Sequence, residues 1–220
     1  MITIAFKKTI DGIYVSHTDI LRSLNRTFRR AGIEVAYSKG YNRHMSLKLT
    51  QPLPFGIASD EEWVSCEIVG MITTEELLEK FNLHCPPYLK AHLAYKVEGN
   101  PNLAALVVAS DYFIECKEAI KYKAEIEKIK NHFEVEINRK EEQYIKEVSQ
   151  DIYGLAITDK GIYFQLPFGN KNLRIDSVGN QLAKNFGLEI DNTNMRRLHQ
   201  YVSVDNKFIE VSKYLETLKI

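Results

Sequence analysis

In residues 1–98, stretches with the apolar period of a strand and stretches with the apolar period of a helix follow one another in an order that few folds have. Patterns typical of strands occur at 1–15, with a turn at Asp11-Gly12, and again at 34–38, 46–53, 63–69 and 88–97. Helical patterns lie between them at 16–32 and 73–81. With 34–38 taken as a short extra segment, the order is strand, helix, strand, strand, helix, strand. This order predicts a ferredoxin-like (split βαβ) α+β domain over residues 1–98.

The first predicted helix has a strong start signal and two distinct faces. Ser16 can cap the first turn, and the side chain of Asp19, three residues on, can hydrogen-bond back to Ser16. Asp19 also lies at the positive end of the helix dipole. The apolar residues Ile20, Leu21, Leu24, Phe28 and Ala31 fall on one arc, and Arg22, Arg26 and Arg29 fall on the opposite side. We therefore expect a helix that covers a sheet and exposes a stripe of arginines.

The second half repeats the same order of patterns more loosely. Residues 99–110 are predicted to be a linker, because Glu98-Gly-Asn-Pro-Asn breaks regular structure. After it, strand patterns occur at 111–117, 144–154, 155–157, 162–168 and 195–202, and helical patterns at 120–132, 177–186 and 207–218. The predicted fold class is therefore α+β, with two tandem ferredoxin-like domains, 1–98 and 111–220, that contain antiparallel sheets. The second domain could also be a related α+β unit.

Charge is balanced over the chain but not along it. The whole sequence has 29 basic and 29 acidic residues, whereas residues 1–50 hold nine basic and three acidic ones, a local balance of 9 − 3 = +6. Tyrosines are interleaved with these cations, as on surfaces that bind phosphates and stack bases. RNA binding is predicted for Arg22, Arg26, Arg29, Arg30, Lys39, Tyr41, Asn42, Arg43 and Lys48. The alternative interpretation is an ordinary solvated helix surface.

Other motifs point to no cofactor or metal. The sequence has no phosphate-binding glycine motif, no nucleophile elbow, no zinc-protease motif and no clustered cysteines. Cys66, Cys85 and Cys116 are far apart, which predicts reduced thiols. The chain has no signal-peptide pattern and no apolar run long enough for a membrane span, so we expect a cytoplasmic protein.

Two histidines and an aspartate are the candidate catalytic residues. His17 and Asp19 lie in the first helical turn, and His44 lies in the polar turn 38–49, SKGYNRHMSLKL. If the helix start and this turn meet at one rim of the sheet, the two imidazoles can share a site. The alternatives are a capping segment and a loop histidine. Arg174 and Asp176 are interpreted as a helix cap with a surface arginine, and Arg196-Arg197 as a surface pair.

One long run resembles a known family. VSHTDILRSLNRTFRRAGIEVAYSKGYNRHMSLKLTQPLPFGIASDEEW is similar to the opening of the radical-SAM-linked bacterial family of unknown function. That pattern has a Ser-His-Leu-Asp helix start, an Arg-Arg-Ala-Gly helix end, a Gly-Phe-Asn-Pro-His-Pro turn and a Pro-Leu-x-x-Gly segment. Weaker similarity extends to the Leu-Arg-x-Asp of 173–176. The matching residues are Ser16, His17, Asp19, Arg22, Arg29, Arg30, Gly32, Tyr37, Ser38, Gly40, Asn42, His44, Pro52, Pro54 and Gly56.

The chain departs from the family pattern at four positions. Thr18 replaces leucine, Tyr41 replaces phenylalanine, and Arg43 and Met45 replace the two prolines of the turn. Because proline restricts the backbone, the turn is expected to be less rigid than in the family.

The resemblance implies an accessory protein rather than an enzyme on its own. Members of that family occur beside or fused to radical-SAM proteins, and near genes for ribonuclease G and ribosomal components. This implies an RNA-binding accessory for RNA or ribosome modification, with tRNA or ribosomal RNA and a radical-SAM enzyme encoded nearby as partners. Two alternatives remain. One is a metal-independent ribonuclease that uses His17 and His44, by analogy with tandem ferredoxin-like endoribonucleases. The other is a protein-interaction module for the radical-SAM partner.

Overall fold

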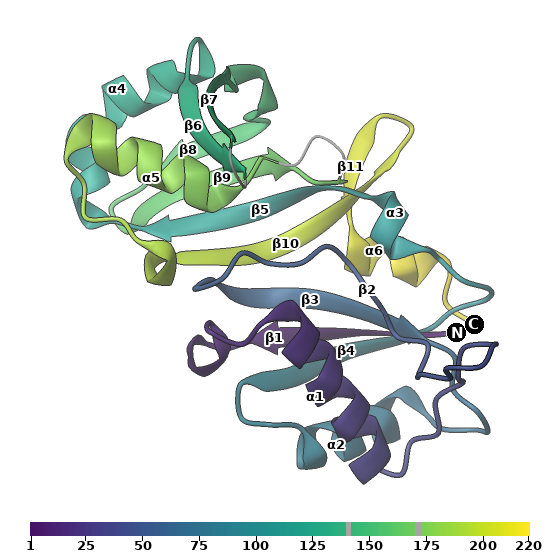
Figure 1. Cartoon of the computed structure of the whole chain (residues 1–220). Coiled ribbons are helices and arrows are strands. Elements are labelled where there is room, and N and C mark those ends of the chain that lie inside the picture. Colours follow the sequence, from purple (N-terminus) through teal and green to yellow (C-terminus); the bar gives the residue numbers. More distant parts are fainter. Residues whose placement is uncertain (140–141, 170–172) are drawn as a thin grey trace.

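The computed structural model describes residues 1–139, 142–169 and 173–220, and in this part of the chain it is a mixed α+β structure with six α-helices (Figure 1). The first half contains β1 (Ile2–Lys8), α1 (His17–Arg30), β2 (Lys48–Leu49), β3 (Ala58–Cys66), α2 (Thr74–His84) and β4 (Leu89–Lys96). The second half contains α3 (Leu103–Leu106), β5 (Val107–Glu115), α4 (Lys123–Glu127), β6 (Glu134–Arg139), β7 (Glu142–Glu147), β8 (Gly154–Ile157), β9 (Gly161–Pro167), α5 (Ile175–Phe186), β10 (Met195–Val204), β11 (Lys207–Glu210) and α6 (Val211–Thr217).

One large sheet runs through both halves. Its order is β4-β1-β3-β10-β5-β9-β8, with β2 paired to β3 and β11 paired to β10, while β6 and β7 form a separate hairpin. All of these pairs are antiparallel except β3–β10, which is parallel at Arg196–Ala58 and Arg197–Ser59. The prediction of an α+β chain with mostly antiparallel pairing is therefore confirmed, and the two halves share one sheet.

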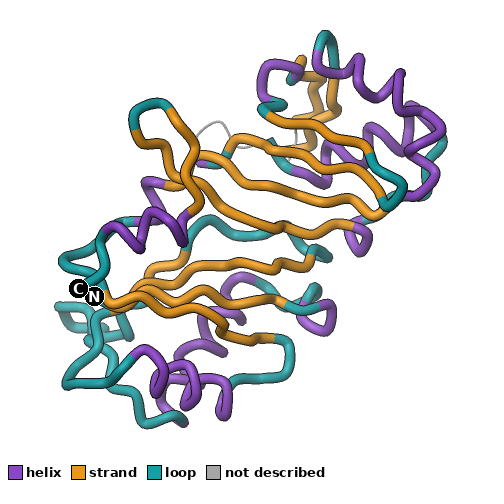
Figure 2. Tube along the Cα trace, turned by 180° about the vertical axis from the view of Figure 1, so that it is seen from behind, coloured by secondary structure: helices purple, strands orange, loops and turns teal. Residues whose placement is uncertain are grey.

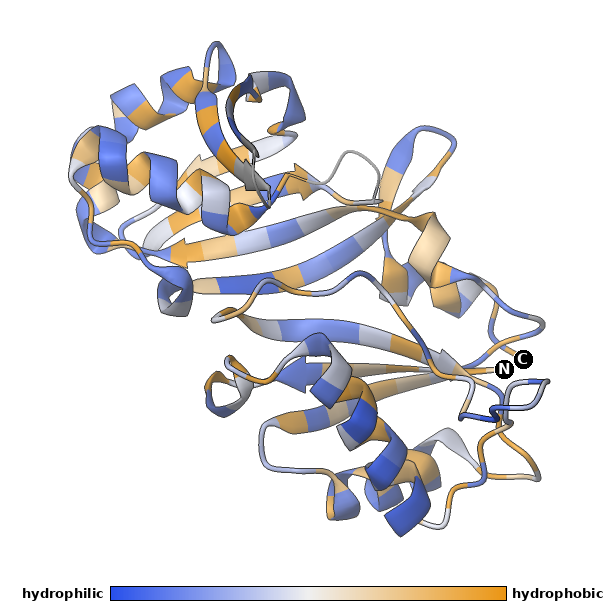
Figure 3. Ribbon diagram, viewed as in Figure 1, coloured by the Kyte–Doolittle hydropathy of each residue, from blue (hydrophilic) through white to orange (hydrophobic). Residues whose placement is uncertain are grey.

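The helix α1 forms as its sequence pattern predicts. Ser16 caps it by accepting a hydrogen bond from the Asp19 backbone N–H at 3.2 Å. Ile20, Leu24 and Phe28 are buried, and the Phe28 ring packs edge-on against Phe81 of α2, with centroids 5.5 Å apart. The outward side of α1 is hydrophilic (Figure 3). The apolar arc thus fixes α1 to the sheet and leaves its arginines outside.

Several predicted boundaries are wrong. The strand expected at 46–53 is reduced to Lys48–Leu49, and the strand expected at 63–69 begins at Ala58. The extension of β3 pairs with β10, so β3 meets β2 at one end and β10 at the other. The predicted linker 99–110 contains α3 and the start of β5. The predicted final helix 207–218 divides into the strand β11 and the helix α6.

The helices leave part of one sheet face uncovered. One face packs on α1 and α2 through Ile4 and Val64, and on α5 in the second half. The other face packs on α3 and α6 through Ala5 and Trp63. Seen from behind, the strands of this second face lie in view over much of their length (Figure 2). We call this surface the open face.

Two further findings concern the whole described chain. No helix in residues 1–139, 142–169 and 173–220 is long and apolar enough to cross a membrane. Cys66, Cys85 and Cys116 are all free, and burial raises the pKa of the Cys66 thiol to about 12.

Candidate functional site

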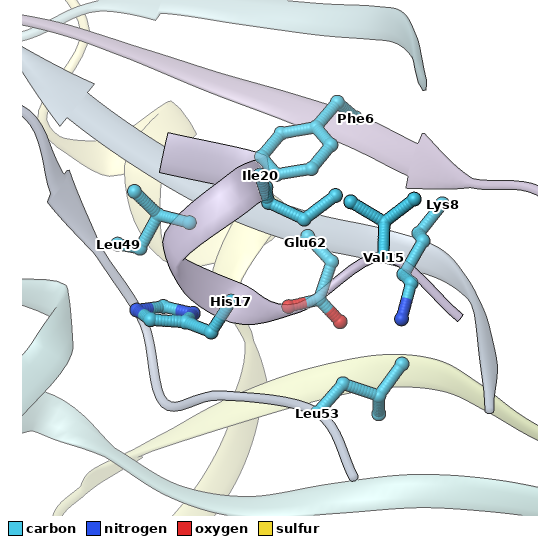
Figure 4. A pocket seen from close by; sticks show the side chains of 8 residues that line it. All are labelled: Phe6, Lys8, Val15, His17, Ile20, Leu49, Leu53 and Glu62. Atoms are coloured by element: carbon cyan, nitrogen blue, oxygen red, sulfur yellow. The ribbon is translucent and has the colours of Figure 1, made fainter. Parts of the chain in front are cut away.

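The start of α1 places His17 in a pocket of the first half. The pocket lies against β1, β3 and the segment after β2, and its lining residues are Phe6, Lys8, Val15, His17, Ile20, Leu49, Leu53 and Glu62. Figure 4 shows the Glu62 carboxylate between the His17 imidazole and the Lys8 ammonium group. Burial lowers the pKa of His17, although the charge of Glu62 opposes this shift. The predicted catalytic residue His17 thus lies beside two charged groups.

We expect the His17 imidazole to titrate below the ordinary range of histidine. Near that ordinary pKa, the unfolded chain binds more protons than the folded one. The free energy of unfolding should therefore fall as the pH drops through the histidine range, and it should recover as the pH rises. NMR titration of the imidazole measures the shift, and the His17→Asn variant should lose this part of the pH dependence of stability. A midpoint above that of free histidine would contradict the placement of His17.

A buried ion pair lies next to this pocket. The Arg197 Nη1 group donates to both Glu62 carboxylate oxygens, at 2.8 and 3.0 Å, and the Arg197 side chain is 1% exposed. Arg197 also donates to the Tyr112 hydroxyl and to the Gln51 backbone carbonyl. Its guanidinium lies 4.9 Å from the Phe168 ring centroid. A carboxylate from β3 and a guanidinium from β10 therefore connect the two halves.

Lys8 adds a second buried cation. It is 5% exposed, and its Nζ donates to the Ile13 carbonyl at 3.2 Å. Burial lowers the pKa of Lys8, Glu62 raises it, and Arg197 lowers it further. Lys8 in the pocket and Arg197 beside it are thus two buried cations near the single carboxylate of Glu62.

The sequence did not identify these partners. The prediction that Arg196 and Arg197 are both surface residues is wrong for Arg197; Arg196 is the exposed one of the two, with 51% of its side chain accessible. Adjacent strand residues point to opposite faces, so one arginine is buried and the other is solvated. Lys8 and Glu62 were also missed. Three consecutive acidic residues, 60–62, directly before the buried Trp63 were the available signal, because acids inside a buried strand usually have partners.

The structure does not bring His44 to His17. His44 is exposed, and its Nδ1 lies 3.0 Å from the Ser38 hydroxyl. Its loop lies next to the last turn of α1, where Arg29 donates to the Tyr37 hydroxyl at 3.4 Å. About 18 Å of helix separates His17 from Arg29, at 1.5 Å per residue. The helix reverses the chain direction, so the segment after it lies at the opposite rim of the sheet.

Asp19 is part of the helix cap. It accepts hydrogen bonds from the Ser16 hydroxyl at 2.7 Å and from Arg22 Nη1 at 2.9 Å. Both partners lower the pKa of Asp19, Ser16 more strongly. The structure therefore gives Asp19 a capping position at the surface and places His17 alone in the pocket.

The predicted RNA-binding residues lie on α1, on the loop after it and on β2, and this set is here named the α1 surface. Its members are all exposed, and they are Arg22, Arg26, Arg29, Arg30, Lys39, Tyr41, Asn42, Arg43 and Lys48. In the described part of the chain, Arg22 is the only one of their cations in an ion pair, with Asp19. A groove includes Arg29 of this surface and is lined further by Tyr37, Met45, Val69 and residues 32–36.

Two family-like segments also meet between the halves. A second groove is lined by residues 51–55 together with Tyr112, Arg174, Ile175 and Arg197. Arg174 precedes α5 and donates to Asp176, as Nε to Oδ1 at 2.9 Å. The Asp176 carboxylate also accepts the Ser177 backbone N–H. Segments far apart in sequence, the Pro-Leu-Pro-Phe-Gly run and the Leu-Arg-x-Asp run, thus lie at one junction.

Comparison with known proteins shows the family of the chain. No curated protein matches the chain. One protein family does, over residues 1–176, a range that includes the strands β1 to β9 and ends before β10. The chain belongs to this bacterial family, which is described as uncharacterized protein conserved in bacteria (DUF2344).

Proposed function

We propose that the chain is an RNA-binding accessory protein that binds RNA through the α1 surface. The observation that carries the proposal is that most cations of this surface have no carboxylate partner among the described residues. Its cations are exposed, and in the described residues one of them, Arg22, contacts a carboxylate. Unpaired surface cations attract phosphates, which supply most of the affinity in nonspecific nucleic-acid binding.

The shape of the α1 surface suits a single strand. Arg22, Arg26 and Arg29 are spaced so that they lie on one side of α1. At the end of this row, the fully exposed Tyr41 offers a ring for base stacking, next to the groove lined by Arg29 and Tyr37. Phosphates would follow the arginines while a base stacks on the loop.

The fold proposal is a tandem of ferredoxin-like units. In the first half β4, β1, β3 and β2 are neighbours in that order, and in the second half β10, β5, β9 and β8 are. Each half thus repeats the strand order 4-1-3-2 with helices between strands, and β6–β7 is an insertion. This repeat supports the tandem arrangement.

The resemblance given above adds a partner to the proposal. A separate radical-SAM enzyme would modify the RNA that this chain presents, with tRNA or ribosomal RNA as the substrate class. The ribonuclease alternative based on His17 with His44 has no support from the geometry, because the two residues lie at opposite ends of α1. The protein-interaction alternative becomes the better account of the α1 surface if RNA does not bind.

The test compares two triple variants of equal charge. Arg22/Arg26/Arg29→Ala should weaken binding of a fluorescent single-stranded RNA on the order of tenfold at low salt. It should also reduce the slope of log affinity against log salt by about 2, because each phosphate contact contributes about 0.7. Lys117/Lys121/Lys128→Ala removes three exposed lysines from the second half and should leave both quantities nearly unchanged. Fluorescence anisotropy at several salt concentrations measures them. Equal losses in the two variants, or no binding by wild type at 50 mM salt, would contradict the proposal.

A further inference from the structure

Three irregularities in the strand ladders meet on the open face. The β1–β3 register shifts between Phe6 and Lys8, and the β1–β4 register shifts between Ala5 and Phe6. The β10–β5 register shifts between Arg197 and Gln200. Such bulges re-aim side chains and are over-represented next to active sites. Five polar residues at these three shifts are here named the bulge cluster: Lys7, Asp60, Glu61, His92 and His199.

Glu61 and His199 form an anchored pair within the bulge cluster. The Glu61 side chain is 7% exposed, and its Oε1 accepts the Trp63 indole N–H at 2.9 Å. Its Oε2 lies 3.6 Å from His199 Nδ1, and the His199 side chain is half-exposed. A buried carboxylate that faces one ring nitrogen fixes the orientation of an imidazole. His199 Nε2 is thus left for a different partner.

Two cations lie beside this pair. Asp60 is 3.6 Å from Lys7 Nζ and also 3.6 Å from Arg196 Nη1. All three side chains are partly exposed, and two positive charges share one carboxylate. Lys7 and Arg196 are the groups of this region that can contact phosphate oxygens, and the carboxylates of Asp60 and Glu61 balance their charge. On the other side of Lys7, the buried Nδ1 of His92 has no hydrogen-bond partner among the described residues.

The surroundings shift the pKa values of His199 and His92 in opposite directions. The adjacent Glu61 carboxylate raises the pKa of His199, with smaller contributions from Glu210 on β11 and Asp111 on β5, against the effect of burial. Burial lowers the pKa of His92, against the charge of Glu61. Opposed shifts of this kind are typical of sites that transfer protons.

We propose that the bulge cluster, together with Arg196, is an acid–base site that cleaves a phosphodiester of RNA. His199 is its catalytic residue, and Glu61 is the positioning residue. The choice of RNA as substrate rests on the function proposed above. The site is separate from the α1 surface, because α1 covers the opposite face of the sheet.

The reaction needs no co-reactant, because RNA supplies its own nucleophile. His199 Nε2 accepts the proton of a ribose 2′-hydroxyl, and the 2′-oxygen forms a bond to phosphorus. The bond from phosphorus to the 5′-oxygen breaks, and the imidazolium gives its proton to that oxygen. The products are a 2′,3′-cyclic phosphate end and a 5′-hydroxyl end. Lys7 and Arg196 contact the non-bridging phosphate oxygens.

The experiment incubates the full chain with a fluorescent RNA in EDTA over pH 5–9 and identifies the new ends. We expect wild type to produce 2′,3′-cyclic phosphate ends, and His199→Ala to lower the rate by about 100-fold or more. His132→Ala is the matched control, because His132 is also an exposed histidine beside carboxylates. That variant should cleave like wild type. Circular dichroism checks that each variant is folded.

The pH profile of the cleavage rate distinguishes a positioning role of Glu61 from a purely structural one. Loss of the Glu61 charge should let His199 lose its proton at lower pH, so Glu61→Gln should shift the acidic limb of the rate profile downward. His199→Gln supplies a second variant if the alanine variant does not fold. Intact RNA after long incubation with wild type, or equal cleavage by His199→Ala, overturns this inference. If the chain binds RNA through the α1 surface but does not cleave it, the cleavage site is refuted and the RNA-binding proposal stands. If the chain cleaves RNA but does not bind it through the α1 surface, the proposed binding surface is refuted and the cleavage site stands.

Discussion

Replacing Arg197 with methionine is expected to lower the free energy of unfolding by about 3–5 kcal/mol. The variant leaves the Glu62 carboxylate, 9% exposed, without its guanidinium partner. The Tyr112 hydroxyl and the Gln51 carbonyl lose a donor at the same time. A buried charge without a partner is costly because water cannot replace the lost interaction. Urea unfolding followed by circular dichroism measures the loss.

The neighbouring arginine provides the control. Arg196→Met removes an equal charge from the same strand, but its side chain is half-exposed and lies 3.6 Å from Asp60, so we expect a loss of about 1 kcal/mol or less. The double variant Arg197→Met/Glu62→Leu should recover only part of the stability lost by Arg197→Met, because it removes the buried pair but leaves the buried Lys8 ammonium without a nearby carboxylate. Equal effects of Arg196→Met and Arg197→Met would show that the ion pair contributes little.

The large effect expected at Arg197 follows from its position between the halves. The strands β3 and β10 pair at two register positions, Arg196–Ala58 and Arg197–Ser59. Beyond them the strands are connected by side chains, including Arg197 to Glu62 and Gln200 Nε2 to the Glu61 carbonyl at 2.9 Å. Buried pairs are screened little by salt, so high salt should not reproduce the effect of the substitution.

Local signals made α1 and α2 predictable. The Ser16 cap and the apolar arc of α1 depend on residues within a few positions, and α2 has a similar cap, in which Thr73 accepts the Glu76 N–H. The short β2 and the β3–β10 joint were not predictable in this way. The β3–β10 joint depends on contacts between residues more than 130 positions apart, and β2 pairs with β3 at only two positions, Lys48–Ser65 and Leu49–Val64. Strand periodicity alone does not show which neighbour a strand will have, or over what length.

The candidate sites also divide into residues predictable from the local sequence and residues that depend on distant contacts. The exposed arginines of the α1 surface could be predicted, because the helical period separates them from the apolar arc. The hypothesis that His17 and His44 lie at one rim of the sheet does not agree with the structure, because α1 carries the chain to the opposite end of the sheet before His44. Glu61 and His199 lie 138 positions apart, and both stand at bulges. A bulge shifts which face a residue occupies, so simple alternation along the sequence cannot identify the pair.

Replacing Trp63 with alanine should lower the free energy of unfolding by about 3–5 kcal/mol. Trp63 is fully buried in the core under α6, and its ring centroid lies 6.2 Å from that of Tyr95. Alanine leaves a cavity and removes the indole N–H that donates to Glu61. Thermal and urea unfolding measure the loss, and a change as small as that of an exposed residue would contradict the buried placement of Trp63.

The Trp63→Phe variant separates packing from hydrogen bonding. Phenylalanine keeps most of the apolar contact but donates nothing, so the loss should be smaller, about 1–3 kcal/mol. Without the indole donor, the negative charge of Glu61 is less neutralised and should favour the protonated form of His199 more strongly. The NMR titration midpoint of His199 should therefore rise above its wild-type value. An unchanged midpoint with intact folding would show that Trp63 supports the core without tuning the Glu61–His199 pair.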